Sequence, residues 1–246
     1  GIAPDEEVKL PDSVTNVLNV TESEDFIKKR KDKIYNVCCW SFPGEWVTEV
    51  ADSWRTGGDI FNNFGAVLEQ LDNIKSLAKY NTPGHVNDLD MMQVGNGLSY
   101  EEDKSHFSMW CMMSTPLVLG MDLNSISDET LSIISNRELI ALNQDAECRP
   151  PYLVRQDNGW TAMVRHLAGN EFAIGVFNFC GDARMAEITF AELGVPAASG
   201  VRLSLCDIIT GEELGEKKDD LFVYVAGHSC KLFRAKFVRE KGRRRG

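Results

Sequence analysis

Charged side chains that could act together lie in two short segments of this 246-residue chain. The first, Trp54-Arg55-Thr56-Gly57-Gly58-Asp59-Ile60, places an arginine and an aspartate around a glycine pair. The second carries Asp88 and Asp90 in an apolar segment, where a carboxylate must be paired, hydrogen-bonded or functional. Carboxylates brought to one site can serve as the acid and base of sugar chemistry. Gly-Gly-Asp is equally the pattern of a turn with a helix-capping carboxylate.

The elements around these segments alternate between strand and helix, which predicts parallel βα units. We expect strands over 34–40, 56–61, 85–92 and 116–120, and helices over 45–53, 65–80 and 100–113. Polar residues at the carboxyl ends of barrel strands converge on one site, so the two charged segments should meet. Four such units make half of an eightfold barrel, and four parallel strands cannot close alone.

The character of the sequence changes after two further helices, expected over 127–135 and 137–143. Short alternating runs follow, separated by turns at Asp157-Asn158-Gly159, Ala168-Gly169-Asn170 and Thr210-Gly211, which is typical of an antiparallel sandwich. We therefore predict an α/β plus all-β chain. Residues 1–148 would form the C-terminal half of a TIM (β/α)8 barrel, and residues 149–246 a β-sandwich domain.

Composition narrows the classes of partner. A net charge of −11 and a pI near 4.9 disfavour nucleic acid, and the basic residues at 241–245 resemble a solvated end. No apolar run is long enough for a membrane span, and the N-terminal residues lack the basic and then apolar pattern of a signal peptide. Seven cysteines without a repeating spacing favour reduced thiols and a cytoplasmic location over secretion. No metal-ligand spacing joins His85 or His106 to them, so we expect no metal and no cofactor.

A series of blocks follows in a fixed order along the chain. The blocks are Trp54-Arg55 with Asp59, Asn87-Asp88-Leu89-Asp90-Met91, Val94-Gly95-Asn96-Gly97, Ser105-His106-Phe107-Ser108-Met109-Trp110, Thr115-Pro116-Leu117, Asp122-Leu123 and Ile140-Ala141-Leu142-Asn143-Gln144-Asp145. Together they resemble the α-galactosidase (melibiase) family of retaining glycoside hydrolases. The resemblance is strong over residues 34 to 146, and Asp207 to Gly211 with the final strands are more loosely similar to that family's C-terminal β domain.

The resemblance implies cleavage of terminal α-galactosyl residues by double displacement, in which one carboxylate attacks the anomeric carbon and the other acts as acid and then base. Residue by residue, Asp59 falls on the family's acid/base, Arg55 on an arginine that contacts the sugar, and Asp90 and Met91 on residues that line the pocket. Trp40 could stack on a sugar ring or pack beneath the site.

Two departures from the family's pattern change the expectation. The nucleophilic aspartate of a Lys-x-Asp strand, and a pair of sugar-binding aspartates, belong to strands that precede this chain; Lys31-Asp32-Lys33 is interpreted as structural. In addition, Cys39 stands where the family commonly has glutamate. With Phe42 nearby, this difference indicates that the substituent at the sugar's 2-position is recognised differently. An arabinopyranoside or a 2-substituted galactoside is therefore a further candidate substrate.

These points predict an enzyme that is incomplete as a single chain. The N-terminal half-barrel or another chain would supply the nucleophile, and an assembly of several copies stays open. The alternative is a truncated, non-catalytic carbohydrate-binding or interaction protein of the same ancestry, whose open edge is covered by a partner.

Overall fold

The computed structural model describes residues 34–196 and 199–239. Three short strands, β1 (Asn36–Val37), β2 (Ser53–Arg55) and β3 (Val86–Asp88), form a parallel sheet in that order. Their register places Asn36 beside Ser53 and Arg55 beside Asp88. This confirms the parallel units predicted from the sequence. The segment Lys31-Asp32-Lys33 and the basic residues 241–245 lie outside the described residues.

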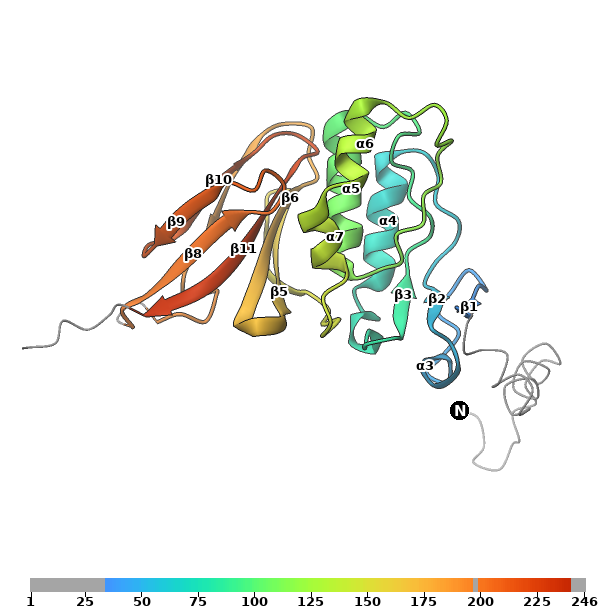
Figure 1. Cartoon of the computed structure of the whole chain (residues 1–246), viewed down its shortest axis with the longest axis horizontal. Helices are drawn as coiled ribbons and strands as arrows, with labels where there is room; N and C mark the ends of the chain where they lie inside the picture. Colours follow the sequence, from blue (N-terminus) through green and yellow to red (C-terminus); the bar gives the residue numbers. More distant parts are fainter. Residues whose placement is uncertain (1–33, 197–198, 240–246) are drawn as a thin grey trace, which may run out of the picture.

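A layer of helices separates this sheet from the rest of the molecule (Figure 1). The helices of this layer are α4 (Phe64–Ile74), α5 (Tyr100–Met113), α6 (Asp128–Ile134) and α7 (Arg137–Asn143). Helix α3 (Val47–Val50) lies instead beside β2 (Figure 1), and a 3-10 turn η1 (Ala78–Tyr80) follows α4. Helix α5 has the predicted bounds because both ends are signalled locally: Ser99 and Glu102 form a capping box, and Ser114 closes the helix at a φ of 54°.

Three expectations for this part of the chain were wrong in extent. The helix expected over 45–53 covers only α3, and β2 begins at Ser53 instead of residue 56. The last sheet bond of β2 runs from the Thr56 amide to the Asp88 carbonyl at 3.1 Å, after which the chain becomes a loop that carries Asp59. Residues 116–120 make no strand but a single parallel bridge between Leu119 and Met92.

The second part of the chain is the predicted antiparallel sandwich. A six-stranded sheet has the order β4-β5-β6-β11-β8-β9, and β10 pairs with β7 in a second sheet. The bounds are β4 Tyr152–Asp157, β5 Trp160–Leu167, β6 Glu171–Asn178, β7 Arg184–Ile188, β8 Val201–Asp207, β9 Glu213–Lys217, β10 Leu221–Val225 and β11 Cys230–Arg239, with a 3-10 turn η2 at Ala168–Asn170. The predicted turns are confirmed, since Asn158, Gly159, Gly169, Asn170 and Gly211 all adopt positive φ.

The central strands β5 and β6 of the large sheet are buried on both faces, which explains why most residues of β5 are apolar. Trp160 and Val164 pack toward the β7–β10 sheet, whereas Met163 and Leu167 join the core formed with the helices. The sandwich therefore rests on the helices, while the parallel sheet lies on their other side (Figure 1). Among the described residues, no helix has the length and apolarity that a membrane crossing requires.

Candidate active site

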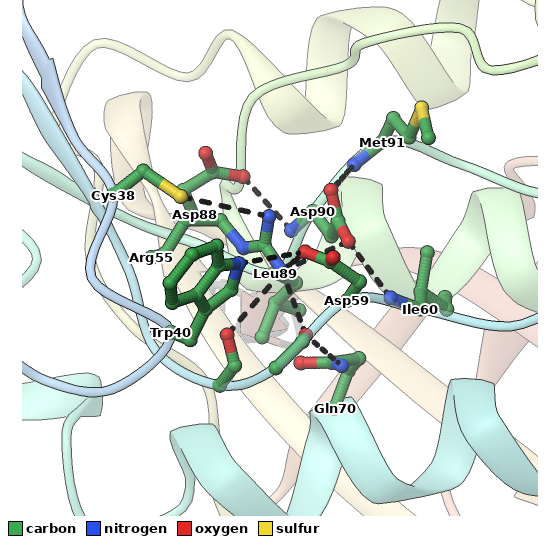
Figure 2. A network of polar contacts seen from close by, with 12 residues as sticks. Cys38, Trp40, Arg55, Asp59, Ile60, Gln70, Asp88, Leu89, Asp90 and Met91 are labelled. Carbon is green, nitrogen blue, oxygen red and sulfur yellow. Dashed lines mark hydrogen bonds and ion pairs between the residues drawn. The ribbon is translucent and has the colours of Figure 1, made fainter.

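Arg55, the last residue of β2, is the centre of a polar network at the carboxyl end of the parallel strands (Figure 2). Its side chain is only 8% exposed. Its Nη2 atom lies 2.7 Å from the Gly58 carbonyl oxygen, 3.2 Å from Asp59 Oδ1 and 2.9 Å from Asp90 Oδ2. The arginine thus joins the two carboxylates that the sequence placed at neighbouring strand ends.

The Gly57-Gly58 turn is shaped by helix α4. Gln70 of α4 donates from Nε2 to the Gly58 carbonyl at 2.9 Å, which fixes the turn from below. A Cβ atom on Gly57 would lie 2.3 Å from Asn73 Nδ2, so a side chain there would force the turn away from the helix. Gly57 is therefore packed closely against helix α4, whereas a Cβ atom on Gly58 would meet no neighbour within 4 Å. The first glycine supports the loop that presents Asp59.

Asp59 is the exposed carboxylate of the network. Its side chain is 65% exposed, and Oδ1 accepts a hydrogen bond from Trp40 Nε1 at 3.1 Å in addition to the Arg55 contact. Trp40 follows β1, has a φ of 57° and is itself 64% exposed. The structure therefore brings the candidate site residues Arg55, Asp59 and Trp40 together and leaves the Asp59 carboxylate open to solvent.

Asp90 is largely buried and its carboxylate is already occupied. Oδ1 accepts from the Met91 amide at 2.8 Å, and Oδ2 accepts from the Ile60 amide at 2.8 Å while pairing with Arg55. The Asp90 carbonyl accepts from Trp110 Nε1 at 3.0 Å. Its φ of 84° lies in the left-handed region, which costs a non-glycine residue about 1–3 kcal/mol. These contacts orient Arg55 and the Asp59 loop and leave Asp90 little capacity for a sugar hydroxyl.

Asp88 is a buried carboxylate that the sequence analysis did not assign to the site. It lies beneath Asp90, where Oδ1 accepts from the Asp90 amide at 2.9 Å and Oδ2 accepts from Asn36 Nδ2 at 2.7 Å. Burial raises the pKa of Asp88, and these bonds together with the Arg55 charge offset only part of that rise.

The thiol that faces the arginine is Cys38, not the predicted Cys39. Cys38 Sγ lies 4.0 Å from Arg55 Nη1, whereas Cys39 Sγ donates to the Ser41 carbonyl at 3.3 Å. Every second side chain of a strand points to the same face, so residue 38 is expected on the face of residue 36, and residue 88 on the face of residue 90. This alternation could have indicated the two missed residues, Cys38 and Asp88.

The side chains of Met91 and Phe42, which were expected to line the pocket, lie apart from the Arg55 network. The Met91 side chain extends away from Arg55 (Figure 2). It lies against Gly120, where an added Cβ atom would come within 3.2 Å of Met91 Sδ. The Phe42 ring stacks on Tyr80 with centroids 4.8 Å apart and meets the buried Trp54 edge-on at 6.4 Å. Phe42 is therefore a packing residue beside β2, and the structure does not bring it to the Arg55 network.

Only one of the three carboxylates in this network can exchange a proton freely with a ligand, because Asp88 and Asp90 are each 8% exposed. Residues 34–196 and 199–239 contain no group of three or more histidine, cysteine, aspartate or glutamate side chains that could hold a metal ion. The arrangement as it stands offers one acid or base, one guanidinium and one exposed indole on an open sheet edge.

Comparison with known proteins identifies the family. The family model "Alpha galactosidase A" matches residues 17–145, and the model of the α-galactosidase C-terminal β-sandwich domain matches residues 157–235. Alpha-galactosidase A of Cellvibrio japonicus is 44% identical over 131 residues, covering 48% of this chain and 32% of that protein. Alpha-galactosidase of Oryza sativa is 34% identical over 206 residues, covering 82% of this chain and 49% of that protein.

A solved structure agrees with these matches. The crystal structure of α-galactosidase I from Mortierella vinacea superposes with a TM-score of 0.79 at 25% identity, covering 87% of this chain and 60% of that one. The chain spans about half the length, or less, of the curated relatives named above. By its two family matches and its fold, the chain belongs to the α-galactosidase (melibiase) family, of which it carries part of the catalytic barrel and the C-terminal β-sandwich.

Proposed function

We propose that this chain contributes the acid/base half of a retaining α-galactosidase-type active site. The observation that carries the proposal is Asp59, an exposed carboxylate at the carboxyl end of a barrel strand, held by Arg55 and flanked by Trp40. Asp90 and Asp88 are buried and bonded, so neither is free to attack a sugar. The nucleophilic carboxylate would come from the N-terminal half of the barrel.

In this reaction the partner carboxylate attacks the anomeric carbon while protonated Asp59 gives its proton to the departing glycosidic oxygen. The bond to the leaving group breaks and a glycosyl ester forms. Asp59 then removes a proton from water, whose oxygen attacks the anomeric carbon and releases the carboxylate. Arg55 would donate to a sugar hydroxyl through Nη1, since its Nη2 is already committed to the loop.

The proposed substrate is a terminal α-galactoside, with a related pyranoside as the rival. Cys38 lies against Arg55, and Cys39 is exposed beside Trp40, so neither position offers the carboxylate that commonly follows the first cysteine in the family. We propose that discrimination at the sugar's 2-position is weaker here. Comparing α-galactopyranoside, β-L-arabinopyranoside and 2-acetamido substrates would measure that discrimination. The cytoplasmic location predicted from the cysteines stays a prediction.

The decisive assay is the release of 4-nitrophenol from its α-D-galactopyranoside at about pH 5 to 7. The chain alone should release none, and co-expression with the N-terminal half-barrel of the Oryza sativa relative should restore turnover. Asp59→Asn should then lower kcat by at least about 100-fold, because no group can activate the water that hydrolyses the glycosyl ester. Azide, a nucleophile that needs no base, should recover part of the rate.

The matched control is Asp72→Asn, an exposed aspartate on helix α4 that lies outside the network. It should leave turnover unchanged. Full activity of the completed barrel with Asn at position 59 would overturn the assignment of Asp59.

The second candidate is a non-catalytic carbohydrate-binding protein of the same ancestry. It is favoured by the exposed Trp40 indole beside the Asp59 carboxylate, since an aromatic face next to a polar group can bind a sugar ring without catalysis. Binding of galactose to this chain, seen by tryptophan fluorescence through the exposed Trp40, combined with no turnover after complementation, would support it.

A further inference from the structure

A strained aspartate organises the polar network. Asp90 keeps a positive φ because four groups hold it: the Met91 and Ile60 amides bind its carboxylate, Arg55 pairs with it, and Trp110 binds its carbonyl. One further bond acts on its backbone amide, and that bond comes from Asp88. Without an acceptor at this position the Asp90 amide would be buried and unpaired, and the backbone would gain by turning to the ordinary region.

Asp88 also links the three parallel strands. Its second oxygen accepts from Asn36 Nδ2, and the same nitrogen lies 2.7 Å from Ser53 Oγ. Asn36 belongs to β1, Ser53 to β2 and Asp88 to β3, so one cluster of side chains spans the sheet directly below the Arg55 network. A shift of Asp88 would therefore be felt at Asp90 and, through it, at Arg55.

We propose that Asp88 is a positioning residue of this active site, which holds Asp90 in its left-handed conformation and thereby aims Arg55 at Asp59. The role rests on the proposed function of Asp59 and Arg55, but its structural part is independent of catalysis. Asp88 touches no reacting group and acts only through Asp90. Burial raises its pKa, so an ionised carboxylate here is costly, and a residue chosen for sheet stability alone would not require it.

The test uses two variants and reporters that need no turnover. Both Asp88 oxygens accept hydrogen bonds, so in Asp88→Asn the new NH2 group must face either the Asn36 NH2 group or the Asp90 amide, and the link from Asn36 to Asp90 is broken in both cases. In the exchange Asn36→Asp with Asp88→Asn, donor and acceptor are restored with their directions reversed. The Ile60 and Met91 amides, which bind Asp90, and the Trp110 indole report the network by 1H–15N NMR.

We expect Asp88→Asn to shift the Ile60, Met91 and Trp110 resonances and to speed exchange of the Ile60 amide by about tenfold or more. The exchange variant should return these signals toward their original values. The Trp54 indole, which binds Asn87 on the other face of the sheet, is the internal control and should not move. Asn36→Ala, on an exposed edge residue, gives a milder test if Asp88→Asn does not fold.

Unchanged Ile60, Met91 and Trp110 signals in a folded Asp88→Asn protein would overturn the proposal. So would a Trp54 signal that moves as much as theirs, since that would show general loosening of the sheet. In the complemented barrel, positioning predicts a rise in KM together with a fall in kcat, partly reversed in the exchange variant. If complementation yields no enzyme at all, the NMR result still decides the role of Asp88, so the two proposals fail separately.

Discussion

At the scale of single residues, burial decides what each carboxylate of this chain can do. Asp59 and Asp90 both contact Arg55, yet one is exposed and the other is enclosed by amide donors. Asp103 on helix α5 is a third case. It is 5% exposed, Oδ2 accepts from the Gly95 amide at 3.0 Å, and Oδ1 has no partner among the described residues. Burial, reinforced by the Glu102 charge, raises the pKa of Asp103 to about 6.

Asp103→Asn should therefore stabilise the protein at neutral pH. Because the folded pKa lies above the ordinary value of 3.8, ionisation destabilises the fold progressively between pH 3.8 and about 6 and fully above it. Asparagine keeps the acceptor for Gly95 and removes the charge, with an expected gain of about 1–2 kcal/mol. Urea unfolding at pH 7.5 and pH 4 should show the gain at the higher pH only. The exposed Glu69→Gln is the control, and an equal gain at both values would contradict the charge explanation.

At the scale of elements, one arginine joins two helices to the sandwich. Arg165 of β5 is fully buried and donates from Nη1 to the carbonyls of Cys111 and Leu142 at 3.0 and 2.9 Å, near the C-terminal ends of α5 and α7. Carbonyls at helix ends carry partial negative charge, so two helix ends stabilise the guanidinium. Burial lowers the pKa of Arg165, opposed by nearby thiol and carboxylate groups.

Arg165→Met should lower the free energy of unfolding by about 2–4 kcal/mol, because the helix-end carbonyls lose their donor. Arg165→Lys should recover part of the loss, since Nη1 alone binds the two carbonyls and an ammonium can donate to both, although from a shorter side chain. Arg155→Met is the matched control. That arginine lies on neighbouring β4 with its side chain 31% exposed and makes surface ion pairs, so its loss should cost less than about 1 kcal/mol. A stable Arg165→Met protein would show that the desolvation cost of the arginine outweighs its bonds.

At the scale of the whole molecule, acidic residues at the start of α5 fasten the helical layer to the turn before β11. Glu102 Oε1 lies 2.8 Å from His228 Nδ1, and Glu101 binds Ser229. Burial acts to raise the pKa of Glu102, but hydrogen bonds from Ser99 and the contact with His228 outweigh it, and the net pKa is lowered. The contact is thus a pH-dependent link between the two parts of the chain.

Glu102→Gln should lower stability by about 0.5–1 kcal/mol at pH 7, and the difference from the unchanged protein should disappear in acid. A depressed folded pKa means that the stabilisation is complete above the ordinary value of 4.5 and is lost as the pH falls through the folded pKa. Glutamine retains the capping acceptor for Ser99, so the comparison isolates the charge. Thermal unfolding followed from pH 8 to pH 3 would measure it, and a pH-independent difference would assign the effect to packing.

Local signals allowed much of the architecture to be predicted. The helix expected over 100–113 matches α5, whose ends the structure shows to be capped locally, and Asn-Gly and Gly-Asn turns indicated hairpins of the sandwich. Strand limits were less accurate, since β2 begins three residues before the expected segment at 56. A three-residue strand has too little pattern of its own, and its limits are set by the neighbouring strands that pair with it.

The sequence by itself determined the family and the order of parallel units and sandwich, and it indicated Arg55 and Asp59 as candidate site residues, because each inference depends on residue type and spacing along the chain. Only the tertiary structure decided that Cys38 faces the arginine, that Phe42 packs against Tyr80, and that Asp90 is enclosed while Asp59 is open. These properties depend on which side chains from other elements occupy the surrounding space. Burial and hydrogen-bond partnership are relations between distant segments, and no local pattern encodes them.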